Sequence, residues 1–158
     1  MRPKVYLETT IPSYLTAWPS RDLVKAAHQQ ITREWWQTRA RFDFYISQVV
    51  LREAGGGDVE AARLRLEVVE GIPVLALSPE ASALAQQLLQ HGPLPAKAAI
   101  DALHIGIAAV NGMDYLLTWN CTHIANAAIR YQIETLCRTS GYVPPVLCTP
   151  EELMEAKS

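Results

Sequence analysis

Charged residues are scarce in this chain, and their scarcity excludes several classes of protein. Aspartate, glutamate, lysine and arginine make up 19% of the 158 residues, where about 25% is usual. Hydrophobic residues make up 49%, so the chain is not an intrinsically disordered segment. The net charge of −2 excludes a globally basic nucleic-acid-binding protein. Contact with nucleic acid would need a local patch of basic side chains.

Cysteine is also rare, and long apolar runs are missing. The three cysteines have a spacing that fits neither a zinc site nor a disulfide framework: Cys121, Cys137 and Cys148. The N-terminal segment turns acidic at Glu8, unlike a signal peptide. The longest nearly apolar stretch, residues 98–110, is too short to cross a bilayer. We therefore expect a reduced, soluble, cytoplasmic protein.

Strand and helix patterns alternate along the chain, whose length predicts a single domain over residues 1–158. Short apolar or β-branched runs predict four or five strands, at residues 5–7, 42–46, 72–77, 115–118 and 146–148. Amphipathic or capped segments predict helices at residues 22–41, 47–53, 58–69, 79–91, 96–110 and 122–139, and a short one after 149. This alternation favours an α/β fold, a three-layer α/β/α sandwich with a mostly parallel sheet.

Three polar residues follow predicted strands closely. Glu8 ends the first strand, Glu53 lies on the short helix after the second, and Asn120 comes soon after the fourth. In an open α/β sheet, ligands bind outside the carboxyl ends of the strands. We therefore expect these three side chains to contribute to a functional site.

Asp101 lies within an apolar helix, about two turns from its predicted start and too deep for an N-cap. An ionised carboxylate there is costly unless it is paired or binds a metal. An ion pair with arginine or lysine, or a hydrogen bond to a hydroxyl, remains an alternative. Several carboxylates and one amide would form an oxygen-rich site that suits Mg²⁺ or Mn²⁺ better than zinc. Such a cation can activate water and offset the charge that builds on a phosphodiester.

Three segments of the chain resemble the PIN-domain ribonucleases of VapC-type toxins. Residues 5–15 (VYLETTIPSYL) resemble the opening strand with its first acidic ligand. Residues 101–105 (DALHI) resemble the helix that carries the third acid, and residues 115–120 (YLLTWN) the strand that leads to the fourth. Glu53 occupies the place of the second acid. The resemblance spans about residues 3–148 and rests on the order and spacing of these short motifs.

The resemblance implies a metal-dependent endoribonuclease, the toxin of a toxin–antitoxin pair. It implies Mg²⁺ or Mn²⁺ as cofactor, RNA as substrate, an antitoxin as partner, and a homodimer. Glu8 and Asp101 would be the main metal ligands, and Glu53 would bind metal or accept a proton from water. Asn120 would position a second metal or its water. Three residues are candidates for contact with the substrate: Thr9, Thr118 and His123. The Thr118 hydroxyl can bind either a carboxylate or the scissile phosphate, and His123 can instead orient Asn120. Helix capping, solvation and backbone hydrogen bonding remain alternatives.

Two departures from the family pattern change what we expect. The family usually opens with aspartate where this chain has Glu8, and its fourth position is usually acidic where Asn120 stands. The site then has three formal negative charges, so we expect one well-held metal, a weaker second site, and slow catalysis or greater dependence on Mn²⁺. A titration that finds two equally tight Mg²⁺ sites would contradict this.

Two other functions remain open at this stage. The first is a PIN-like module that has lost catalysis and binds RNA or a protein partner. The second is an unrelated doubly wound domain that binds a nucleotide or small anion, which is disfavoured because no glycine-rich loop follows the first strand.

Some histidines and tryptophans are interpreted as structural. His104 is taken as a core histidine and His28 as a surface residue. The adjacent Trp35 and Trp36 point about 100° apart on a helix. Either one of them faces a partner instead of the core, or both pack at a corner between helices.

Overall fold

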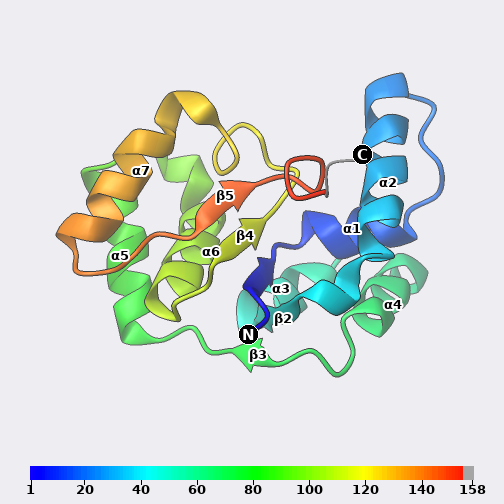
Figure 1. Ribbon diagram of the computed structural model, residues 1–158, viewed down its shortest axis with the longest axis horizontal. Helices are drawn as coiled ribbons and strands as arrows, with labels where there is room; N and C mark the ends of the chain where they lie inside the picture. Colours follow the sequence, from blue (N-terminus) through cyan, green and yellow to red (C-terminus); the bar gives the residue numbers. More distant parts are fainter. Residues whose placement is uncertain (155–158) are drawn as a thin grey trace.

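The computed structural model describes residues 1–154 and has the α/β architecture that the sequence predicts (Figure 1). Five strands form one sheet in the order β3-β2-β1-β4-β5, and every neighbouring pair is parallel. The strands are β1 (Lys4–Leu7), β2 (Asp43–Ser47), β3 (Val74–Leu75), β4 (Tyr115–Leu117) and β5 (Val146–Cys148). None of the helices in the described residues combines the length and apolar character that crossing a membrane requires.

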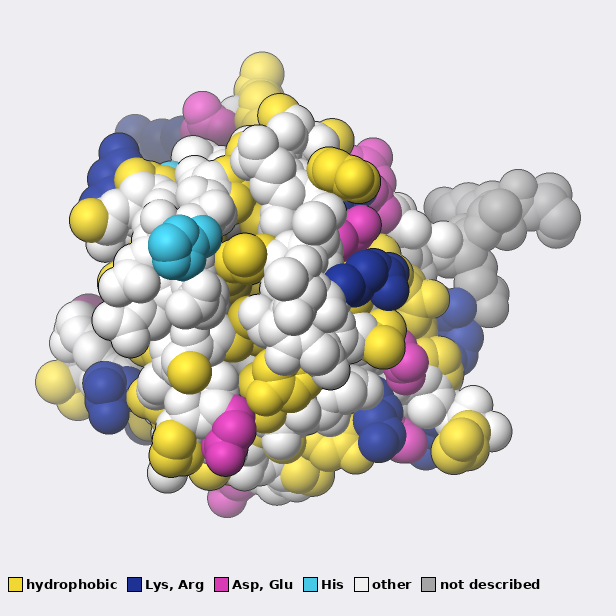
Figure 2. Space-filling view, turned by 90° about the vertical axis from the view of Figure 1, so that its left-hand side faces the viewer, with side chains coloured by type: hydrophobic (Ala, Val, Ile, Leu, Met, Phe, Trp, Pro, Cys, Tyr) yellow, Lys and Arg dark blue, Asp and Glu magenta, His cyan; other side chains and the backbone are white. Residues whose placement is uncertain are grey.

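Helices lie on either side of the strands. In Figure 1, α5, α6 and α7 gather at the left, and α1, α2 and α4 at the right. Figure 2 turns the left-hand side toward the viewer, where lysine and arginine side chains are scattered and form no continuous stripe. The helices are α1 (Thr10–Thr16), α2 (Leu23–Trp36), α3 (Gln48–Ala54), α4 (Val59–Val68), α5 (Pro79–Gln90), α6 (Ala99–Val110) and α7 (Ala127–Thr139), with 3-10 turns η1 (Arg39–Arg41) and η2 (Ala96–Ala98).

The strand order creates a topological switch between β1 and β4. The chain runs outward from β1 through β2 to β3, then returns to the other side of β1 and continues through β4 to β5. At such a point the loops after the two central strands diverge, and a crevice opens between them. The Glu8 backbone N–H donates to the Leu117 carbonyl at 3.0 Å, which holds the ends of β1 and β4 together.

The sheet is buried on both faces, as parallel sheets require. Val5, Tyr6 and Leu7 in β1 and Leu116 and Leu117 in β4 have at most 1% of their surface exposed. The central strands therefore form a rigid base for the loops that leave their carboxyl ends.

Both adjacent tryptophans pack into one aromatic cluster. Trp35 is fully buried against Phe42 and Phe44, and Trp36 is half-buried and stacks on Phe44. Neither of these two side chains projects into solvent, whereas Trp18 is 91% exposed.

Capping side chains set several helix starts where the sequence predicts them. Asp22, Ser47, Asp58 and Ser78 each accept a hydrogen bond from the backbone N–H three residues later. These bonds satisfy N–H groups that have no partner within the helix. The helices α2, α3, α4 and α5 accordingly begin one residue after these caps.

Other predicted boundaries are wrong for local reasons. The helix predicted to reach residue 41 ends at Trp36, because the Thr38 hydroxyl binds the Trp35 carbonyl and the chain continues as η1. The helix predicted from residue 122 or 123 begins only after Asn126, whose side chain caps α7.

Two shorter elements also differ from the prediction. The strand predicted over residues 72–77 shrinks to β3, an edge strand that pairs only with the end of β2. The helix predicted after residue 149 is a series of turns up to Met154, and residues 155–158 lie outside the described part.

The helix predicted over residues 96–110 is divided into η2 and α6. Asp101 therefore lies in the first turn of α6, and its side chain is 21% exposed. A carboxylate in a first turn interacts favourably with the helix dipole. The cost of burying Asp101 is therefore lower than the sequence suggests.

Substituting Gly106 with alanine is expected to destabilise the fold. A Cβ at this position in α6 would lie 2.5 Å from the Ala81 carbonyl oxygen of α5. Such overpacking costs about 1–3 kcal/mol, and the higher helix propensity of alanine offsets at most about 1 kcal/mol of it. Urea unfolding should show the loss, whereas Gly56→Ala, whose Cβ would have 3.5 Å of clearance, should stay close to wild type. Equal stability of the two variants would contradict the close helix contact.

Candidate metal centre

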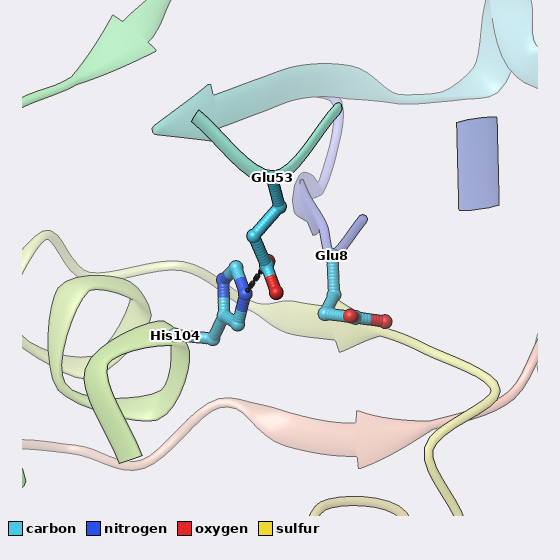
Figure 3. Close-up of side chains that lie close together, drawn as sticks. All are labelled: Glu8, Glu53 and His104. Atoms are coloured by element: carbon cyan, nitrogen blue, oxygen red, sulfur yellow. Dashed lines mark hydrogen bonds and ion pairs between the residues drawn. The ribbon is translucent and has the colours of Figure 1, made fainter. Parts of the chain in front are cut away.

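Glu8, Glu53 and His104 lie together at the carboxyl edge of the sheet (Figure 3). One ligand atom from each lies within 4.8 Å of the others. Glu8 follows β1, Glu53 lies on α3 after β2, and His104 lies on α6. The strand order thus brings the two predicted glutamates together, and it adds a histidine that was interpreted as a core residue.

Glu8 is 5% exposed and is held through one of its two carboxylate oxygens. Its Oε1 accepts from the Thr10 backbone N–H at 3.1 Å, the Thr10 hydroxyl at 2.5 Å and the Thr118 hydroxyl at 2.6 Å. No described residue donates to its Oε2. Such partners fix the orientation of a carboxylate and leave the second oxygen available to a cation.

Glu53 is held in the same way. Its Oε1 accepts from the Thr9 hydroxyl at 2.6 Å and from His104 Nε2 at 2.7 Å. Burial alone would raise the pKa of Glu53, but the hydrogen bonds from His104 and Thr9 outweigh it and place the pKa below its ordinary value. Glu53 is therefore a carboxylate at neutral pH, with Oε2 left without a donor among the described residues.

The lowered pKa of Glu53 predicts an acid-sensitive contribution to stability. The folded state holds this proton less tightly than the unfolded chain, so the contribution is present above pH 4.5 and lost as pH falls through the folded pKa. Without divalent cations, wild type should lose more unfolding free energy between about pH 6 and pH 3 than Glu53→Gln does.

The control for this comparison is Glu70→Gln. The Glu70 carboxylate is exposed and makes no hydrogen bond within residues 1–154, so this variant should follow the wild-type acid profile. Equal acid sensitivity of wild type and Glu53→Gln would contradict the prediction.

A second group of polar side chains connects Asp101 to Glu8. Asp101 Oδ2 lies 2.9 Å from His123 Nδ1, and the His123 backbone N–H donates to Asn120 Oδ1 at 2.9 Å. The Asn120 backbone N–H donates to the Thr118 hydroxyl, which itself donates to Glu8. His123 therefore lies in a turn that orients Asn120, and it is not part of a helix.

The structure does not bring Asp101 into the closest group of ligand atoms, which consists of Glu8, Glu53 and His104. The alternative of an ion pair with arginine or lysine is wrong within the described residues, because Asp101 contacts His123 instead. As in the two glutamates, one carboxylate oxygen of Asp101 is bound and the other has no donor among the described residues. Its role as a metal ligand stays a prediction.

Thr10 and Trp119 help to hold Glu8 in place, and neither was predicted from the sequence as part of the site. The Thr10 hydroxyl donates to Glu8 and accepts from the Trp119 backbone N–H at 2.9 Å. The Trp119 ring stacks on His28 at 4.0 Å and on Tyr14 at 6.0 Å. His28 is thus half-buried instead of fully on the surface. The sequence feature that could have indicated Thr10 is the pair of threonines, Thr9 and Thr10, directly after Glu8.

No protein-family model matches the sequence, and no curated protein matches it either. Solved structures do match its fold. VapC20 of Mycobacterium tuberculosis, described as a sarcin–ricin loop cleaving toxin, has 14% identity and a TM-score of 0.57, covering 88% of this chain and 96% of its own. VapBC2 from Rickettsia felis, bound to a DNA fragment from their promoter, has 17% identity and a TM-score of 0.50. This match covers 74% of the chain described here and 88% of the VapBC2 chain.

These likenesses confirm, at the level of the fold, the resemblance that the short motifs carry. Both comparisons cover most of each chain, so they concern most of the fold instead of one motif. The chain has the PIN-like α/β/α fold of VapC-type toxins.

Proposed function

We propose that the protein is a metal-dependent endoribonuclease and the toxin of a toxin–antitoxin pair. The observation that carries this proposal is the pairing of Glu8 and Glu53 at the switch point, each with one oxygen bound by the protein and the other without a donor within residues 1–154. The likeness to VapC20, described as cleaving the sarcin–ricin loop, supports the same class of reaction.

The donor set fits a hard divalent cation. Carboxylate oxygens are preferred ligands of Mg²⁺ and Mn²⁺. We assign the tighter cation to Glu8 and Glu53, and a weaker second cation to Asp101 and Asn120. When bound, such a cation supplies Lewis acidity and positive charge next to the phosphodiester.

The other site residues orient these ligands. Thr9, a candidate substrate contact, donates its hydroxyl proton to Glu53, and Thr118 donates to Glu8, a carboxylate being one of the two partners expected for it. His123 holds Asp101 and Asn120 together. Their hydrogen bonds fix the carboxylates before a cation or RNA binds, which lowers the cost of assembling the site.

Binding of a nucleotide or small anion is disfavoured by the position of Glu8. The free N–H groups at a helix N-terminus commonly bind phosphate. Here the N–H of Thr10, the first residue of α1, donates to the Glu8 carboxylate instead. A negative charge already stands where an anion would bind.

A catalytically weak PIN-like module that binds RNA or a protein is the second candidate function. It is favoured by Asn120 in place of an acid and by Asp101 lying outside the closest ligand group. Against it, no arginine or lysine in the described residues forms an ion pair with Glu8, Glu53 or Asp101.

The partners follow from the same proposal: RNA as substrate, an antitoxin as binding protein, a second copy of the chain as dimer partner, and the cytoplasm as the place of action. The similar VapBC2 structure supports the antitoxin. We place the RNA along the edge of the sheet that carries the carboxylates, next to the proposed metal site.

Cleavage of labelled single-stranded and structured RNAs tests the proposal directly. We expect cleavage with Mg²⁺ or Mn²⁺, none with EDTA, and recovery when Mn²⁺ is added in excess. If the folded protein cleaves none of these RNAs with either cation, the nuclease proposal fails and the binding module becomes the better account.

A further inference from the structure

A chain of buried hydrogen bonds runs from the start of α3 to Glu53. The Val50 N–H donates to Ser47 Oγ at 3.2 Å, and Ser47 Oγ lies 2.8 Å from the Tyr6 hydroxyl. The Tyr6 hydroxyl lies 2.6 Å from His104 Nδ1, while His104 Nε2 reaches Glu53 at 2.7 Å. Ser47, Tyr6 and His104 have no exposed surface, so solvent cannot replace the hydrogen bonds among these three, whereas Glu53 at the end of the chain is 36% exposed.

Counting protons gives each bond a direction. Ser47 Oγ already accepts from the Val50 N–H, and the Tyr6 oxygen is the acceptor within reach of the Ser47 hydroxyl proton. Ser47 therefore donates to Tyr6, and the Tyr6 hydroxyl donates to His104 Nδ1. A nitrogen that accepts carries no proton, so the ring proton is on Nε2, which donates to Glu53. Every proton in the chain has one acceptor.

The opposite direction leaves a group unsatisfied. If His104 also carried a proton on Nδ1, Tyr6 would donate to Ser47, and the Ser47 hydroxyl proton would have no acceptor among the described residues. The direction of the hydrogen bonds therefore favours the ring with its proton on Nε2 alone.

We propose that Ser47 and Tyr6 hold His104 in this Nε2-protonated form, so that His104 donates to Glu53 and does not ligate the metal. A protonated nitrogen has no lone pair to offer, whereas a free imidazole nitrogen is a preferred ligand of zinc. Tyr6 is then a positioning residue that keeps the centre all-oxygen and selects Mg²⁺ or Mn²⁺ against Zn²⁺. This inference rests on the metal site of the proposed function.

The protonation pattern of the His104 ring can be measured without RNA. Nitrogen-15 NMR of the ring, with the signals assigned by their loss in His104→Gln, should show a proton on Nε2 and none on Nδ1. The pattern should persist when Mg²⁺ is added. A proton on Nδ1, or loss of the Nε2 proton on adding Mg²⁺, would overturn the inference. Failure of Mg²⁺ to bind at all would count against the proposed function and leave the ring result intact.

Tyr6→Phe tests the selectivity, and Tyr45→Phe is its matched control. Tyr45 pairs with Tyr6 across β1 and β2, and its hydroxyl has no hydrogen bond within the described chain. In Tyr6→Phe, His104 Nδ1 no longer receives a proton from Tyr6, so the ring can move its own proton there and offer Nε2 to zinc.

Calorimetric titration with each cation measures the outcome. For Tyr6→Phe we expect Mg²⁺ affinity about 10-fold lower, as for other changes in groups that hold metal ligands, and Zn²⁺ affinity higher than in wild type. Tyr45→Phe should bind both cations as wild type does. Equal loss of both affinities in Tyr6→Phe would reveal a merely structural role and overturn the selectivity.

Discussion

Replacing Glu8 with glutamine is expected to abolish binding of the tighter cation and to reduce cation-dependent RNA cleavage strongly. Three donors point at Oε1 of the buried Glu8 carboxylate. A glutamine must place its carbonyl oxygen there to accept these bonds. Its NH₂ group then occupies the position of the free Oε2, where it repels a cation instead of binding it. The substitution keeps the size of the side chain but removes both the charge and the ligand atom.

Two measurements check this result. At a Mg²⁺ concentration 100 times its Kd, wild type should gain about 2.7 kcal/mol of unfolding free energy, and Glu8→Gln should gain none. Cleavage should fall by about 1,000-fold, which corresponds to about 4 kcal/mol of transition-state stabilisation. Glu70→Gln should match wild type in both assays. A Glu8→Gln protein that Mg²⁺ still stabilises would contradict the assignment of Glu8 as a ligand.

The sheet and its functional edge can be predicted from sequence because their signals are local. Apolar runs identify the strands, and Ser47, Asp58 and Ser78 identify helix starts through their own caps. The positions of Glu8 and Glu53 after their strands then follow from the topology alone.

The boundaries that fail depend on contacts that hydrophobic periodicity does not encode. The start of α7 is delayed because the Asn120 carbonyl accepts from the N–H groups of Ile124 and Ala125 and closes a turn before the helix can begin. The predicted helix over residues 96–110 breaks after Ala98 although its apolar pattern continues.

His104 shows why part of the site cannot be predicted. Its position in an apolar helix describes a core histidine equally well, and it is indeed fully buried. What makes it part of the site is its contact with Tyr6, 98 residues away, and with Glu53, 51 residues away. Only the folded sheet brings these residues together.

Replacing Asp101 with asparagine is expected to leave the tighter cation bound and to slow cleavage by about 100-fold, or about 2.7 kcal/mol. The reason is geometric, because Asp101 lies outside the group formed by Glu8, Glu53 and His104, and one of its oxygens is bound by His123. Asparagine can still accept a hydrogen bond from His123 through its carbonyl oxygen. Its NH₂ group would then replace the free oxygen on the side of the weaker second site.

The matched variant for this prediction is His123→Ala, which removes the donor and leaves the Asp101 charge in place. The His123 backbone N–H still donates to Asn120 in this variant, so the turn is kept, and we expect a loss of about 10-fold in cleavage. Calorimetric Mn²⁺ titration of both variants should retain the first binding event, and Asp101→Asn should lack the second. If Asp101→Asn loses the first event as completely as Glu8→Gln, the two carboxylates hold the same ion. If it cleaves RNA at the wild-type rate, Asp101 serves only to anchor His123.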